Sequence, residues 1–124
     1  MKLYKITDDK IDLLKTAETP LALLFSSQGC HLCVGLKPIY RTVAADYKEQ
    51  FDFAITNIDM CPQIKEKFVE EGVPTICVVA EGVAYYVPDP QEPEKHTWYS
   101  ADYIKKQLDA FIEGEFYSWN ARMI

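Results

Sequence analysis

The chain has 124 residues, of which 48% are hydrophobic, and its 19 acidic and 13 basic side chains give it a formal net charge of −6. This size and composition predict a single globular domain over residues 1–124 and are unlike those of a disordered chain. The negative charge disfavours nucleic acid and anionic membrane surfaces as partners.

The N-terminal residues lack the apolar stretch of a signal peptide, and no apolar run approaches the roughly 18 residues that span a bilayer. We therefore expect a cytoplasmic protein that makes no membrane contact and acts as a monomer. Thiols are kept reduced in the cytoplasm, so the four cysteines do not predict a framework of structural disulfides. A closely spaced pair in such a protein is more often catalytic or metal-binding.

The N-terminal part of the chain begins with a strand pattern. Residues 3–7 predict a short strand, and Ile11 and Leu14 lie on the apolar face of a helix that ends at Pro20. Residues 21–25 form a continuous apolar run, which is typical of a central strand covered on both faces.

The middle of the chain continues the alternation of helix and strand. A helical pattern follows Cys33, and Pro38 predicts a kink in that helix. Residues 51–58 predict the next strand. Residues 62–69 predict a helix with proline in its first turn, which ends before Gly72.

The C-terminal part of the chain predicts a hairpin and one more helix. Residues 75–79 and 83–87 are separated by a loop short enough for an antiparallel hairpin. Residues 88–99 are rich in proline and charge and predict a loop, and residues 104–112 predict the final helix. The aromatic tail, residues 115–124, receives no assignment.

The predicted order is therefore β-α-β-α-β-α-β-β-α. Two right-handed crossovers give three parallel strands, and the hairpin adds two antiparallel strands to the same sheet. We expect an α/β domain with a five-stranded mixed sheet, helices on both faces, a core at about residues 3–113 and a tail at residues 114–124. Ligands of such sheets bind at the carboxyl ends of the parallel strands, and Cys30 directly follows one of these ends.

The segment Cys30-His31-Leu32-Cys33 fits three kinds of site: a reactive dithiol, half of a zinc site or an inert structural pair. At the start of a helix, the Cys30 sulfur faces free backbone N–H groups and the positive end of the helix dipole, and both favour the thiolate. Cys33 lies one turn further in and is expected to stay protonated until needed. In the dithiol interpretation, Cys30 attacks a substrate disulfide and Cys33 then displaces the substrate.

The cysteine pair and two distant segments resemble the thioredoxin family. Cys30-His31-Leu32-Cys33 stands where that family has its Cys-Gly-Pro-Cys active site, and Gly72-Val73-Pro74-Thr75 looks like its cis-proline loop. Pro38 matches the proline that kinks the family's active-site helix. The resemblance covers residues 3–112 and implies a thioredoxin fold with thiol–disulfide oxidoreductase activity.

The resemblance also implies roles for individual residues and partners. Cys30 and Cys33 are the implied catalytic residues, and Val73, Pro74 and Thr75 are expected to shape the substrate groove. The implied partners are disulfide-containing protein substrates and an upstream reductase or dithiol donor. Because the Cys30–Cys33 disulfide is itself the redox group, no separate cofactor is expected.

Four positions depart from the thioredoxin pattern. Leu24 and Ile55 stand where the family has a buried Asp and its Lys partner, so we expect slow proton transfer at Cys33. Gly29 replaces the Trp that precedes the first cysteine. His31 replaces a Gly, and its imidazolium would favour the Cys30 thiolate and make the disulfide more oxidising; the alternative is a solvated side chain that tunes nothing.

Cys61, His96 and Trp98 are candidate accessory residues. Cys61 follows a parallel strand and is either a regulatory thiol or an unreactive residue at a helix start. Residues 88–99 are longer than the corresponding thioredoxin loop. They carry His96 and Trp98, which either narrow substrate choice and replace the missing Trp or belong to a solvated loop.

We expect no metal site. Zinc would need two ligands besides Cys30 and Cys33, and Cys61, Cys77, His31 and His96 show no second paired spacing. Cys77 falls within a predicted strand, where a cysteine most simply acts as a small buried hydrophobic residue.

Two other functions remain open at this point. The first is a thioredoxin-fold binding or adaptor module with little turnover, which the uncharged Leu24 and Ile55 favour. The second is a glutaredoxin-like, glutathione-dependent reductase. This second function is disfavoured because the Gly-Gly segment that binds glutathione in glutaredoxins has no counterpart here, and because the chain carries an additional N-terminal β-α unit.

Overall fold

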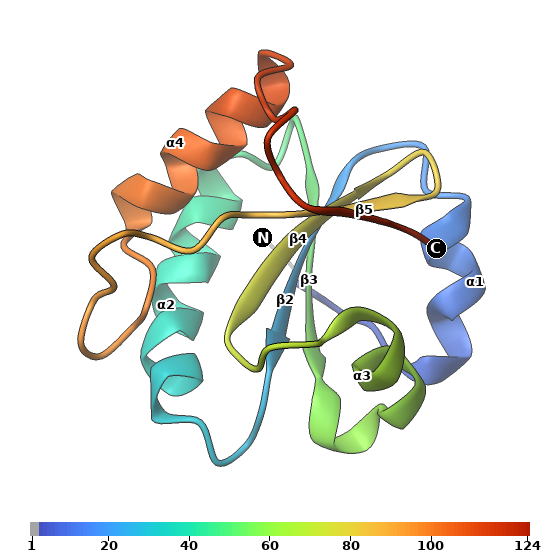
Figure 1. Ribbon diagram of the computed structural model, residues 1–124, viewed down its shortest axis with the longest axis horizontal. Coiled ribbons are helices and arrows are strands. Elements are labelled where there is room, and N and C mark those ends of the chain that lie inside the picture. Colours follow the sequence, from blue (N-terminus) through green and yellow to red (C-terminus); the bar gives the residue numbers. More distant parts are fainter. Residues whose placement is uncertain (1–2) are drawn as a thin grey trace.

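The computed structural model describes residues 3–124 and folds them around one mixed sheet with helices on both faces (Figure 1). The sheet has six strands in the order β1-β3-β2-β4-β5-β6. These strands are β1 (Tyr4–Lys5), β2 (Leu21–Ser26), β3 (Asp52–Asn57), β4 (Thr75–Ala80), β5 (Val83–Tyr86) and β6 (Ala121–Met123).

The parallel strands and the hairpin are arranged as the sequence predicted. β3 pairs in parallel with both β1 and β2, and β4 pairs antiparallel with both β2 and β5. All six residues of β2 are buried, as its continuous apolar run indicated. Between β4 and β5, Glu81 and Gly82 have φ values of 51° and 78°, and two successive positive φ values are typical of a tight turn in a twisted hairpin.

The prediction of five strands is wrong, because the C-terminal tail supplies a sixth. β6 pairs antiparallel with β5, and the backbone N–H of Ile124 donates to the carbonyl oxygen of Gly82 at 3.0 Å. Trp119 precedes β6, is 8% exposed, and packs against Phe111 and Phe116. A three-residue strand has too little alternation to be recognised in a sequence, and it depends on the free edge of β5 to pair with.

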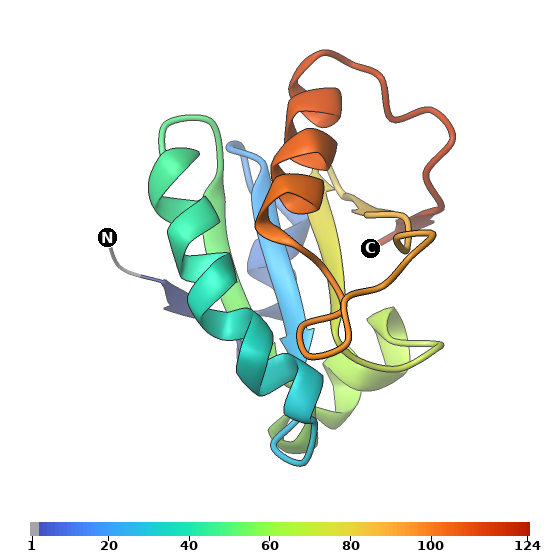
Figure 2. The same cartoon turned by 90° about the vertical axis from the view of Figure 1, so that its left-hand side faces the viewer.

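The helices lie on the two faces of the sheet, with α2 and α4 on one face and α1 and α3 on the other (Figure 1 and Figure 2). The predicted first helix is split into a 3-10 turn and a short α-helix, and Pro38 lies inside α2. No helix within residues 3–124 is long and apolar enough to cross a bilayer. The helical elements are η1 (Asp8–Lys10), α1 (Ile11–Lys15), α2 (His31–Asp46), η2 (Ile58–Met60), α3 (Pro62–Phe68) and α4 (Ala101–Ile112).

Helix α2 is anchored directly to the central strands. The buried Tyr40 hydroxyl lies 2.7 Å from the carbonyl oxygen of Ala22 in β2 and 3.2 Å from that of Ala54 in β3. Leu24 belongs to the same apolar cluster as Leu36 and Tyr40 of α2. These contacts hold α2, and with it the cysteine pair, against the sheet.

Candidate active site

Cys30 and Cys33 form a disulfide bond at the N-terminus of α2. Cys30 is the N-cap residue, and its sulfur accepts a hydrogen bond from the backbone N–H of Cys33 at 3.1 Å. Cys33 is fully buried, whereas Cys30 is only partly buried. Cys30 is therefore the more accessible of the two residues.

The turn before Cys30 is fixed by Asp59 in η2. The Ser27 hydroxyl lies 3.0 and 3.1 Å from the two carboxylate oxygens of Asp59, and the Gln28 backbone N–H donates to one of them at 2.8 Å. The hydrogen bond from Gln28 and, to a smaller extent, the one from Ser27 hold the pKa of Asp59 below its ordinary value. The sequence analysis did not identify this role, although Asp59 follows the strand beside β2 and so lies at the same sheet edge.

The three residues of the predicted substrate groove lie beside Cys30. The Cys30 sulfur is 3.9 Å from the carbonyl oxygen of Val73. The Val73–Pro74 peptide bond is cis, and Pro74 is buried. The Thr75 hydroxyl donates to the carbonyl oxygen of Gly72 at 2.7 Å, and Gly72 has a φ of 119°, which a glycine adopts without strain. The loop before β4 therefore lies beside Cys30, which it contacts through the Val73 carbonyl.

The sheet is apolar where thioredoxins carry their charged pair. Leu24 and Ile55 are direct neighbours across β2 and β3, Leu24 is fully buried, and both side chains belong to or pack against the apolar cluster under α2. Neither residue can accept or donate a proton. Leu24 and Ile55 are thus neighbours in the sheet as two uncharged, apolar residues.

His31 and His96 come from different elements and lie near each other. Their ring centroids are 6.4 Å apart in an edge-to-face arrangement, and both side chains are exposed. His96 belongs to the loop of residues 88–99, which lies against the N-terminal part of α2 (Figure 2). The loop therefore reaches the cysteine pair, and the redox-tuning role of His31 stays a prediction.

The two other cysteines are buried and free. Cys61 is 1% exposed and Cys77 is fully buried. Burial raises the pKa of both thiols, so the unreactive thiol form is favoured in each. Within residues 3–124, no three histidine, cysteine or acidic side chains are grouped so that they could hold a metal ion.

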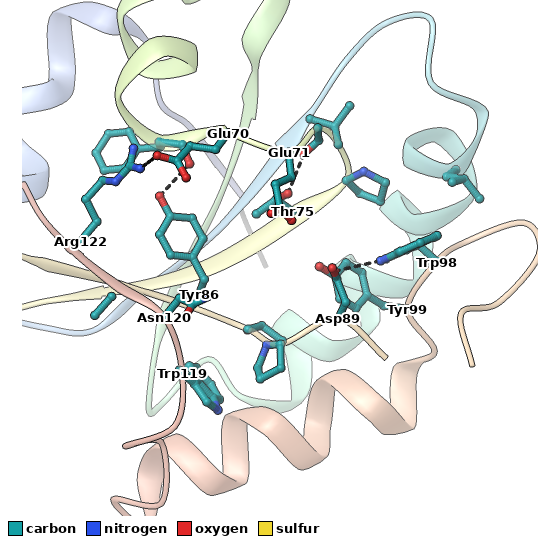
Figure 3. A pocket seen from close by; sticks show the side chains of 18 of the residues that line it. Glu70, Glu71, Thr75, Tyr86, Asp89, Trp98, Tyr99, Trp119, Asn120 and Arg122 are labelled. Carbon is teal, nitrogen blue, oxygen red and sulfur yellow. Dashed lines mark hydrogen bonds and ion pairs between the residues drawn. The ribbon is translucent and has the colours of Figure 1, made fainter. Parts of the chain in front are cut away.

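A groove of about 590 Å³ is lined by Leu32, which lies between the two cysteines, by the loop before β4 and by the C-terminal segment (Figure 3). Leu32 and Trp98 line it near the disulfide, and Arg122 lines its far side, where it forms an ion pair with Glu70. The Tyr86 hydroxyl donates to the carbonyl oxygen of Phe68 at 2.6 Å in the same region. The sequence analysis missed this half of the groove, because it depends on where β6 places the tail.

Comparisons with known proteins agree with this arrangement. Residues 4–98 match the sequence profile of the thioredoxin family. Protein disulfide-isomerase A5 of Bos taurus is 32% identical over 72 residues, which are 56% of this chain and 14% of the bovine protein. Thioredoxin 1 of Chlorobaculum tepidum is 25% identical over 71 residues, which are 57% of this chain and 70% of that protein.

Among solved structures, the zinc-bound form of human ERp44 superimposes with a TM-score of 0.69 at 16% identity, covering 87% of this chain and 30% of that one. This likeness concerns the fold alone. The chain spans only a small part of the bovine isomerase, whereas its match to the family profile extends over more than half of its own length. The chain therefore has a thioredoxin fold and belongs to the thioredoxin family.

Proposed function

We propose that this chain is a thiol–disulfide oxidoreductase that exchanges its Cys30–Cys33 pair with disulfides of polypeptide substrates. The observation that carries the proposal is the contrast between the two sulfurs. Cys30 is accessible and accepts a hydrogen bond at the N-terminus of α2, while Cys33 is buried within reach of it. A backbone N–H and the helix dipole both stabilise a thiolate at Cys30, which is the form that attacks disulfides.

The reaction follows from this asymmetry. The Cys30 thiolate attacks one sulfur of the substrate, forming a mixed disulfide, and the other substrate sulfur leaves as a thiolate. Cys33 then loses its proton and attacks the Cys30 sulfur, which restores the Cys30–Cys33 disulfide and releases the second substrate thiolate. Two electrons have then passed to the substrate, and an external reductase or dithiol must return two electrons to the chain.

The second step is expected to be the slower one. Cys33 must lose its proton before it attacks, and the uncharged Leu24 and Ile55 beneath α2 offer no group to take that proton. Water entering beside Cys30, or the leaving substrate thiolate, must accept it instead. The mixed disulfide should therefore persist longer than in a protein with a buried carboxylate there.

Val73 is partly exposed and lies beside Cys30, which supports an extended polypeptide as the substrate, since an extended chain can bond to backbone groups at the edge of this loop. The exchange reaction itself needs no cofactor beyond the disulfide. Because the pair must be reduced again after each turnover, we place the protein in a reducing compartment such as the cytoplasm.

The proposal is tested by trapping the mixed disulfide. A Cys33→Ser variant, incubated with oxidised insulin as a model substrate, should accumulate a covalent adduct that dithiothreitol releases. A Cys30→Ser variant should form none, and a Cys61→Ser variant that keeps both active-site cysteines serves as the matched control for removal of a thiol. Absence of the adduct from Cys33→Ser would contradict the proposal and favour a binding module without turnover.

A further inference from the structure

The loop of residues 88–99 packs directly against α2 at Gly35. A Cβ atom added at Gly35 would lie 2.3 Å from the carbonyl oxygen of His96 and 3.3 Å from a methyl group of Thr97. At 2.3 Å the added Cβ would overlap with the His96 oxygen. This oxygen belongs to the backbone, so it cannot move away as the end of a flexible side chain can. The loop can therefore occupy this position only because residue 35, two residues after Cys33, has no side chain.

Hydrogen bonds within the loop hold the part that packs against Gly35. Glu94 and Trp98 exchange two backbone hydrogen bonds, each of 3.0 Å, and the Thr97 hydroxyl donates to the carbonyl oxygen of Tyr99 at 2.9 Å. Tyr99 is 1% exposed and anchors the end of the loop in the core. Trp98 itself has a φ of 64°, a conformation that residues with a side chain rarely adopt, and such strain persists only where the surroundings impose it.

This arrangement holds the Trp98 ring at the groove. Its indole N–H donates to the Asp89 carboxylate at 3.2 Å, and Figure 3 shows the two side chains directed toward each other. Both residues line the groove, as does Leu32, which lies between the two cysteines. On the opposite side of the pair, Gly29 precedes Cys30 and supplies no side chain for contact. The aromatic side chain that lines the groove together with Leu32 therefore comes from the loop.

We propose that Trp98 is a specificity-determining residue, which contacts the polypeptide flanking a substrate's disulfide, and that Gly35 is a positioning residue that lets the loop carry Trp98 there. This inference rests on the proposed function and adds to it a class of substrate. The preferred disulfide lies beside an apolar or aromatic side chain of the substrate. Such a side chain would bury the most apolar surface against the indole face and the apolar groove residues Leu32 and Pro74.

The test compares two disulfide-bonded peptides of the same sequence, except for Phe or Gly next to the reactive cysteine. The kcat and KM of each are measured with dithiothreitol as electron donor, and the quantity compared between variants is the ratio of kcat/KM for the Phe peptide to that for the Gly peptide. This ratio is unaffected by a partly unfolded sample, because unfolding lowers both rates equally. For the native chain we expect a ratio of about ten, in favour of the Phe peptide.

Gly35→Ala should bring this ratio close to one, mainly by raising KM for the Phe peptide. Gly29→Ala is the matched control, because it also adds one methyl group beside the cysteine pair, but its Cβ would meet nothing within 4 Å. It should keep the native ratio. Should Gly35→Ala fail to fold, Trp98→Ala carries the same test, with Trp98→Phe expected to retain the preference and Tyr117→Ala, at a side chain 93% exposed, as its control.

The outcomes separate this inference from the proposed function. Bis(2-hydroxyethyl) disulfide, which is too small to reach along the groove, reports on exchange at Cys30 alone. If the native chain reduces it and shows no preference for the Phe peptide, or if Trp98→Ala keeps the native preference, the inference is overturned and the proposed function stands. If the native chain reduces none of these disulfides, the proposed function fails and the inference fails with it.

Discussion

Cys30 and Cys33 lie within one helical turn of each other but differ in their exposure to solvent. Cys30, at the N-cap position, is partly exposed and its sulfur lies beside the Val73 carbonyl, while Cys33 is fully buried. Cys61 and Cys77 are also buried, and burial raises the pKa of both. At the scale of single residues, Cys30 is therefore the one cysteine of the four that is not buried.

Alkylation measures this difference directly. After reduction of the native protein, iodoacetamide near neutral pH should modify Cys30 first, and it should reach Cys61 and Cys77 only once denaturant is added, because the thiolate is the reactive form and both of these thiols are shielded. Mass spectrometry of peptides sampled over time gives the four rates. A rate at Cys61 equal to that at Cys30 would show that Cys61 is a reactive thiol.

Asp59 gives a prediction about pH. Its pKa is lowered in the folded chain by the hydrogen bonds from Gln28 and Ser27, so the stability it contributes is fully present above the ordinary value of 3.8 and is lost as the pH falls through the lowered value. Asp59→Asn removes this charge, so the native chain should be the more stable of the two at pH 6, with the difference shrinking toward pH 3. Urea unfolding at both pH values measures it, and a constant difference would contradict the assignment.

At the scale of elements, the strands and helices that position the disulfide could be predicted from the sequence. The apolar run of β2 and the apolar face of α2 are local patterns, and the three-residue turn between β2 and Cys30 places the cysteines at the sheet edge where parallel strands end. The groove residues around Pro74 could be identified only by resemblance to thioredoxin, because nothing local in the sequence connects them to Cys30.

The remaining features depend on contacts between segments far apart in the chain. The close contact at Gly35 forms only because the loop of residues 88–99 folds back onto α2. A glycine within a helical sequence pattern does not indicate which segment packs against it. β6 likewise exists because β5 offers a free edge. Such features follow from the assembled fold, so sequence periodicity cannot predict them.

Trp119 tests the role of the C-terminal segment. Trp119→Ala should lower the free energy of unfolding by about 3 kcal/mol, because a large buried ring is removed from the cluster it forms with Phe111 and Phe116. Chemical denaturation followed by circular dichroism measures the change. Tyr117→Ala, two residues away and 93% exposed, should leave stability almost unchanged. An equal effect of the two substitutions would mean that the tail is not part of the core.

At the scale of the whole molecule, three segments far apart in the chain line one groove. They are the loop before β4, the loop of residues 88–99 and the C-terminal segment, and Leu32, between the two cysteines, lines the same groove (Figure 3). Beneath it the sheet is uncharged at Leu24 and Ile55. The molecule thus combines a cysteine pair of unequal burial and a long groove with a sheet that is uncharged at Leu24 and Ile55.

The central claim is that this arrangement catalyses disulfide exchange through Cys30, and insulin reduction tests it most directly. With dithiothreitol as electron donor, the native chain should reduce insulin disulfides faster than dithiothreitol does by itself, and Cys30→Ser should return the rate to that background. The precipitation of free insulin B chain reports the rate. A native rate no higher than the background, or an acceleration that survives in Cys30→Ser, would contradict the account.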